Sequence, residues 1–185
     1  MVGYPKDVLS KTMLLLELSA VVLLIVVNGL LALSEMAIVS SRISRLKTLA
    51  ERDVVGARRA LALASDPGRF LSAVQIGITL VGILSGAFSG ATLGIRLAGW
   101  LQGLGLPPDI ASTLGVGLVV VAITYASLII GELVPKQIAL RNPEGVAVRI
   151  APAMTVVAKA TAPMVWLLDR SGRLVLALLG QKAQR

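Results

Sequence analysis

Three long stretches of the chain are apolar and almost free of charge. Residues 18–34, 70–95 and 110–131 contain no Asp, Glu, Lys or Arg. A helix needs about 20 apolar residues to cross the hydrocarbon of a bilayer. The pattern therefore predicts an all-α integral membrane protein with membrane helices over residues 13–40, 70–95 and 110–134.

The connections between these stretches differ in charge. Residues 96–109 contain one basic residue, Arg96. The segment 41–69, expected to be helical in part, contains seven: Arg42, Arg45, Lys47, Arg52, Arg58, Arg59 and Arg69. Because short cytoplasmic loops are enriched in Lys and Arg, the segment 41–69 is predicted to be cytoplasmic and the N-terminus to lie outside the inner or plasma membrane.

The C-terminal region is apolar but interrupted. Pro152 and Pro163 break the pattern, and Lys159 lies between them. A lysine at the centre of a span costs roughly 2.5–3.5 kcal/mol on insertion scales. We therefore expect a re-entrant helical hairpin over residues 146–168, followed by an interfacial helix over 169–185. The alternative is a fourth full span.

Polar residues recur inside the predicted membrane helices. Asn28 and Glu35 fall within about 20° of each other on one helix face, as does Glu17 nearer the outer end. Intramembrane carboxylates face the bundle interior or water rather than lipid. Counted from their ends, the three helices bring oxygen groups to one depth, and these are Asn28, Ser34, Glu35, Gln75, Thr79, Ser127 and Glu132. Tyr125 lies seven residues before Glu132 and is expected to share its helix face.

Two acidic side chains among neutral acceptors predict a binding site for a cation. Pro135 adds a further acceptor, because it has no N–H to donate to the carbonyl of Gly131, four residues earlier. Two alternatives remain open at this point. Glu35 would instead be interfacial and pair with Arg42 or Arg45, or Glu132 would form a salt bridge with Lys136.

A stripe of small residues marks the second predicted membrane helix. Glycines recur there every fourth residue, at Gly82, Gly86, Gly90 and Gly94. Small residues at this spacing allow a second helix to approach closely. The stripe predicts a helix-packing seam, a dimer interface or a thin wall beside a transport pathway.

Composition narrows the chemistry. The chain contains no cysteine and no histidine, which excludes thiolate sites and removes the commonest general base and transition-metal ligand. Neither an enzyme nor a cofactor is expected, and a bound metal would be a hard cation on oxygen ligands. The net charge of +8 comes from residues that flank membrane segments, so nucleic acid is not an expected partner.

Three segments carry a family resemblance: "NGLLALSEMAIVSSRISRLKTLAE", "VQIGITLVGILSGAFSGATLG" and "GELVPKQIALRNPEGVA". Together they resemble the transmembrane domain shared by the CNNM and CorC proteins. The resemblance implies a homodimeric cation transporter with three membrane helices and short re-entrant or juxtamembrane helices. It also implies that cytoplasmic regulatory domains, present in full-length relatives, are absent from this chain.

The resemblance also implies ligands for Mg²⁺, which fall on Ser34, Ile78, Gly82 and Glu132. Ile78 and Gly82 have no side-chain oxygen, whereas Mg²⁺ demands near-octahedral oxygen coordination. The stretch "GITLVG" is more similar to the paralogues associated with export of putrescine and cadaverine. We therefore expect export of such diamines through an acidic cavity open to the cytoplasm. The alternatives are a Mg²⁺ transporter that uses Glu132 and Ser34, and a membrane sensor or anchor that transports nothing.

Overall fold

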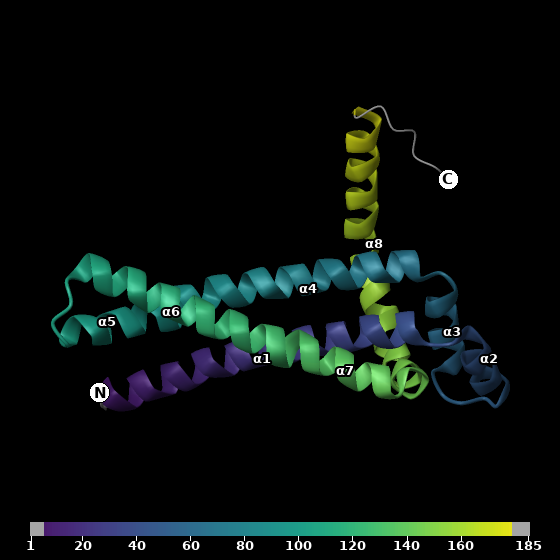
Figure 1. The fold of residues 1–185 in the computed structure, drawn as a ribbon, viewed down its shortest axis with the longest axis horizontal. Helices are drawn as coiled ribbons and strands as arrows, with labels where there is room; N and C mark the ends of the chain where they lie inside the picture. The colour runs from purple at the N-terminus through teal and green to yellow at the C-terminus, as the bar shows by residue number, and fades with distance from the viewer. Residues whose placement is uncertain (1–5, 179–185) are drawn as a thin grey trace, which may run out of the picture. The chain divides into compact units, whose positions relative to one another are not determined.

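The computed structural model describes residues 6–178, and every regular element in that range is helical (Figure 1). Two short π-helical turns, η1 and η2, interrupt the longer helices. The elements in chain order are α1 Lys6–Ser40, α2 Ile43–Glu51, α3 Ala57–Ser65, α4 Pro67–Ser89, η1 Gly90–Gly94, α5 Ile95–Gly103, α6 Pro108–Leu128, η2 Ile129–Leu133, α7 Val134–Arg141 and α8 Pro143–Leu178.

Four helical segments in the described range are long and apolar enough to cross a membrane: Lys11–Ser40, Pro67–Gly103, Pro108–Arg141 and Pro143–Val175. The first three contain the predicted membrane helices, so the all-α membrane class is confirmed. The second runs past its predicted end, and the third continues through Pro135 to Arg141. The fourth covers the region predicted as a hairpin.

The chain divides into two compact units. The first combines the described part of residues 1–32 with Ile78–Pro135. The second combines Leu33–Gly77 with the described part of residues 136–185. Helices α1 and α4 each contribute to both units, whereas α6 belongs to the first and α8 to the second.

A tight helical hairpin, α5–α6, forms one end of the first unit. Its turn contains Gly105, whose φ of 95° is accessible to glycine at little cost. Gly115 lies so close to α5 that a Cβ there would be 2.8 Å from the Cα of Ala98. Arg96 at the start of α5 donates two hydrogen bonds to the carboxylate of Glu17 on α1, at 2.7 and 3.0 Å. Glu17 is therefore a link between two helices.

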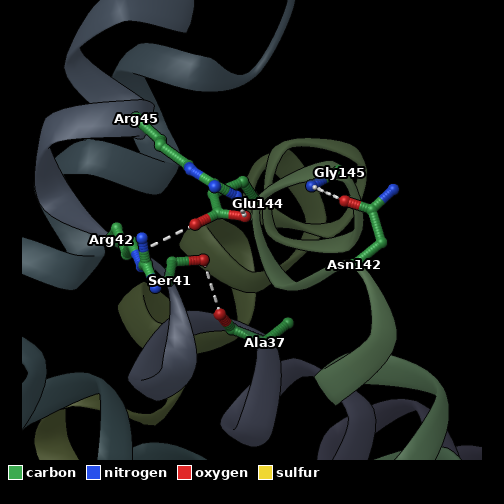
Figure 2. A network of polar contacts seen from close by, with 7 residues as sticks. All are labelled: Ala37, Ser41, Arg42, Arg45, Asn142, Glu144 and Gly145. Atoms are coloured by element: carbon green, nitrogen blue, oxygen red, sulfur yellow. Dashed lines mark hydrogen bonds and ion pairs between the residues drawn. The ribbon is translucent and has the colours of Figure 1, made fainter.

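The start of α8 is fixed within the second unit by its first turn (Figure 2). Asn142 caps the helix, because its Oδ1 accepts a hydrogen bond from the backbone N–H of Gly145 at 3.1 Å. Glu144 accepts another from the backbone N–H of Arg42 at 3.1 Å and lies 3.6 Å from the guanidinium of Arg45. The sequence "NPEG" thus combines a cap, a proline in the first turn and an acid at the positive end of the helix dipole.

The prediction of a hairpin over residues 146–168 with a separate helix from 169 is wrong, because α8 is one helix through both prolines. Pro152 removes the donor to the carbonyl of Val148, at a cost of about 3 kcal/mol in an isolated helix. Packing within the second unit compensates, since this carbonyl lies against Gly56, which has a φ of 88° and no side chain. Residues 179–185 of the predicted interfacial helix lie outside the described range.

Candidate functional site

The nine residues predicted to bind the cation divide between the two units. Six belong to the first unit: Asn28, Thr79, Tyr125, Ser127, Gly131 and Glu132. Three belong to the second: Ser34, Glu35 and Gln75. Each group therefore has its own geometry.

In the first unit, Asn28 contacts the backbone beside Glu132. Its Nδ2 donates a hydrogen bond to the carbonyl oxygen of Gly131 at 3.0 Å. This is the carbonyl that Pro135 deprives of its α-helical donor. The Asn28 side chain is 8% exposed, and its Oδ1 has no hydrogen-bond partner within the described range. The contact leaves a buried oxygen acceptor, which is costly unless a donor or a cation reaches it.

Two glycines allow α1 to come this close to η2. A Cβ on Gly29 would lie 3.2 Å from the Cγ of Pro135, and a Cβ on Gly131 would lie 3.1 Å from the Nδ2 of Asn28. Contacts this short would displace the neighbouring atoms. The sequence analysis identified Gly131 but missed Gly29, for which "NG" in the first membrane helix was the available signal.

The π-helical turn η2 contains Glu132, which is half-buried. Such turns insert one residue into an α-helix and occur frequently at functional sites. The turn changes the helix register between Tyr125 and Glu132, whose shared face is predicted from a spacing of seven residues. Tyr125 is 68% exposed, whereas Glu132 is half-buried. Ser127 is half-buried and Thr79 is exposed.

In the second unit, Ser34 is fully buried and Gln75 is exposed. The carboxylate of Glu35 lies 3.6 Å from the ammonium of Lys136. The alternative in which Glu35 pairs with Arg42 or Arg45 is wrong, because Glu35 lies beside Lys136 instead. The guanidinium of Arg45 and the backbone N–H of Arg42 both contact Glu144 (Figure 2). Lys136 was missed as a partner for Glu35, since spacing along one helix suggested only Glu132.

The glycine stripe behaves in two ways. A Cβ on Gly94 would lie 2.9 Å from the Cα of Val116, and one on Gly90 would lie 3.4 Å from Val120. This half of the stripe packs against α6 within the first unit. No atom in the described range lies within 4 Å of a Cβ built on Gly82 or Gly86.

Two of the nine predicted ligands, Glu35 and Glu132, are carboxylates. Within residues 6–178, no group of three or more acidic side chains gathers closely enough to hold a metal ion. The predicted ligands of the first unit comprise one carboxylate, one amide, three hydroxyls and one backbone carbonyl, at Glu132, Asn28, Thr79, Tyr125, Ser127 and Gly131.

Comparison with known proteins places the chain in a family. It is 53% identical to UPF0053 protein sll0260 of Synechocystis sp. over 165 residues, which are 89% of this chain and 37% of that protein. It is 32% identical to the polyamine export protein of Haemophilus influenzae, over 81% of this chain and 34% of that protein. UPF0053 protein YhdT of Bacillus subtilis is 31% identical, over 86% of this chain and 34% of that protein.

The chain thus spans only about a third of the length of these relatives. The model of one family, the Cyclin M (CNNM) transmembrane N-terminal domain, matches residues 19–185. That match includes most of the first segment able to cross a membrane and all of the other three. The chain is a multi-pass membrane protein and belongs to the family of the CNNM transmembrane domain.

Proposed function

We propose that the chain is the membrane part of a cation exporter and that its substrate is a diamine such as putrescine or cadaverine. The carboxylate of Glu132 attracts the ammonium group, and the Oδ1 of Asn28 accepts a hydrogen bond from it. Thr79 and Ser127 of the same unit remain candidate ligands in this proposal, whereas the exposure of Tyr125 argues against a direct role. The roles of Ser34, Glu35 and Gln75, which belong to the second unit, stay predictions from the sequence. The similarity to the polyamine export protein of Haemophilus influenzae supports the same substrate class.

The observation that carries the proposal is the unpartnered Oδ1 of Asn28 in a side chain that is 8% exposed. Leaving such an acceptor unsatisfied costs about 1–3 kcal/mol. An ammonium group removes that cost, because it brings up to three donors and a charge. The hydrogen bond from the Nδ2 of Asn28 to the Gly131 carbonyl fixes the orientation of the amide.

The chemistry of the predicted ligands favours a diamine over Mg²⁺, which is the second candidate. Mg²⁺ keeps near-octahedral geometry at about 2.0–2.1 Å and is bound mainly through carboxylates and waters. Ile78 and Gly82 contribute no side-chain oxygen. An ammonium group makes no comparable demand and is satisfied by one carboxylate and one amide oxygen.

Calorimetric titration of the chain in detergent with cadaverine and with Mg²⁺ tests the proposal. We expect cadaverine binding that weakens at least tenfold in Glu132→Gln and in Asn28→Leu. Tyr125→Phe is the control and binds as the wild type. Binding of Mg²⁺ that disappears in Glu132→Gln, with no binding of cadaverine, would establish the second candidate in its place.

A homodimer is part of the proposal, with the surface around Gly82 and Gly86 as its contact. Both glycines are open to a second helix, and small residues spaced by four favour close helix association. Gly86→Leu should therefore lower the dimer fraction measured by light scattering in detergent. Gly99→Leu, which is equally open but off the stripe, should not. Equal dimer fractions in the two variants would exclude this surface.

We propose further that α8 lies along the cytoplasmic interface and that the chain crosses the membrane three times. Two contacts and a pocket support this: Glu144 contacts Arg42, Val148 contacts Gly56, and one pocket is lined by both Arg69 and Asp169. At about 1.5 Å per residue, the stretch from Glu144 to Asp169 is about 38 Å long. If α8 crossed the bilayer, only its first turns would lie near the cytoplasmic connection that contains Arg42, Gly56 and Arg69.

Cysteine labelling tests this topology cleanly, because the chain has no cysteine of its own. Ser171→Cys and Ser44→Cys should both react with a membrane-impermeant maleimide applied from the cytoplasmic side. Gln102→Cys should react only from the outside. Labelling of Ser171→Cys from the outside would establish α8 as a fourth span.

A further inference from the structure

A pocket of about 240 Å³ lies within the second unit, between the start of α4 and the middle of α8. It is smaller than the roughly 300–1,000 Å³ of pockets for drug-sized ligands, and suits a headgroup-sized molecule. Its lining residues are Arg69, Ala158, Ala162, Val165, Trp166 and Asp169. None of them takes part in the proposed cation site.

Arg69 and Asp169 line this pocket without contacting each other. Neither side chain forms an ion pair or a hydrogen bond with any residue in the described range. Other opposite charges in the second unit do pair, as Arg58 and Asp53 do at 2.6 Å. A positive and a negative side chain that line one pocket without pairing suit a ligand with one negative and one positive group.

The walls of the pocket indicate where such a ligand comes from. Ala158, Ala162 and Val165 are apolar, and Trp166 lies three residues before Asp169 on the same helix. The same part of α8 exposes further large apolar side chains, since Leu167 is 58% and Leu168 54% exposed. Arg69 lies in the first turn of a helix able to span the membrane, where headgroups are expected. The pocket therefore combines two charged lining residues with an apolar wall.

We propose that this pocket binds the headgroup of phosphatidylethanolamine. The phosphate accepts hydrogen bonds from the guanidinium of Arg69. The primary ammonium donates to the carboxylate of Asp169 and lies near the face of Trp166. The start of an acyl chain packs on Ala158, Ala162 and Val165. A bound lipid would thereby tie the start of α4 to α8.

Lipid binding is measured by native mass spectrometry of the chain released from detergent with defined lipids. We expect phosphatidylethanolamine to bind at least fivefold more tightly than phosphatidylcholine, whose quaternary ammonium cannot donate to Asp169. It should also bind more tightly than phosphatidylglycerol, which has no cation. Arg69→Gln and Asp169→Asn should each remove the preference, whereas Asp169→Glu should retain it. Arg170→Gln, beside the pocket but not in its lining, is the control.

Four results would overturn the proposal. Equal binding of all three lipids, or an unchanged preference in Asp169→Asn, would exclude a headgroup site of this kind. Equal binding of phosphatidylglycerol and phosphatidylethanolamine would indicate a simple anion site at Arg69. Water-soluble phosphoethanolamine binding as tightly as the lipid would show that the apolar wall contributes nothing. Circular dichroism of each variant confirms that a lost preference does not reflect unfolding.

Discussion

Two prolines inside helices free two backbone carbonyls, and the carbonyls have different partners. In the first unit, Pro135 frees the carbonyl of Gly131, which receives a hydrogen bond from the amide of Asn28. In the second unit, Pro152 frees the carbonyl of Val148, which packs against the backbone of Gly56. No side chain in residues 6–178 donates to Val148. The same sequence feature therefore serves polar recognition in one unit and close packing in the other.

The difference lies in the residue that faces the carbonyl. An asparagine offers a donor and brings a second polar atom, which must then be satisfied. A glycine offers only space, and its Cα–H···O contact is a weak interaction. Substitution of Gly56 should therefore lower stability, whereas substitution of Asn28 should lower stability and also weaken ligand binding.

The largest expected effect is that of Gly56→Ala. An alanine with φ near 88° costs about 1–2 kcal/mol, and collision of its Cβ with the Val148 carbonyl adds about 1–3 kcal/mol. Thermal denaturation in detergent should show the corresponding fall in Tm. Gly68→Ala is the matched control, because no atom lies within 4 Å of a Cβ there. Equal Tm values for the two variants would contradict the packing role of Gly56.

Asn28→Leu should have the next largest effect on stability. It leaves the Gly131 carbonyl without the amide donor, which costs about 1–3 kcal/mol, and the loss of the unpartnered Oδ1 offsets part of that cost. Pro135→Ala restores a backbone N–H at position 135, so the same substitution should cost less in that background. A double-mutant cycle of Tm values measures this coupling. Additive effects would mean that Asn28 does not serve the carbonyl freed by Pro135.

Gly131→Ala should be milder, at about 1 kcal/mol, because the added Cβ overlaps the movable amide of Asn28 by only a few tenths of an ångström. Displacing that amide should still weaken cadaverine binding severalfold. Gly117→Ala on α6, where a Cβ meets no atom within 4 Å, is the control for both measurements. Unchanged cadaverine binding in Gly131→Ala would show that the amide of Asn28 does not take part in substrate binding.

The smallest expected effect is that of Arg58→Gln. Its ion pair with Asp53 is largely exposed on both sides, at 79% and 78%. Exposed pairs contribute little to stability. The Tm of this variant should match that of the wild type. That result would show that the close packing of the Gly56 backbone, and not the ion pair, stabilises this turn. A fall as large as that of Gly56→Ala would point to the ion pair instead.

The sequence predicted the membrane helices well, because uninterrupted apolar runs leave few alternatives in a bilayer. It failed at α8, where Pro152 and Lys159 suggested a break. Whether a proline breaks a helix depends on what packs against the freed carbonyl. Here that residue is Gly56, which lies 96 residues before Pro152 in the chain. The π-helical turns were also unpredictable, since they change the register of Glu132 without a clear compositional signal.

The sequence predicted the chemical groups of the candidate site better than the contacts that these groups make. The carbonyl of Gly131 was identified as an acceptor from Pro135 alone, and the structure adds Asn28 as its donor. Glu35 was identified as a buried acid, but its pairing with Lys136 depends on tertiary packing within the second unit. Residue spacing along one helix carries no information on such a partner.

Efflux of labelled cadaverine from proteoliposomes that contain the chain is the most direct test of the transport proposal. The wild type should release cadaverine much faster than empty liposomes, and Glu132→Gln should lower that rate at least tenfold. Tyr125→Phe should transport at the wild-type rate. Release by Glu132→Gln at the wild-type rate would contradict the role of this carboxylate in cation export.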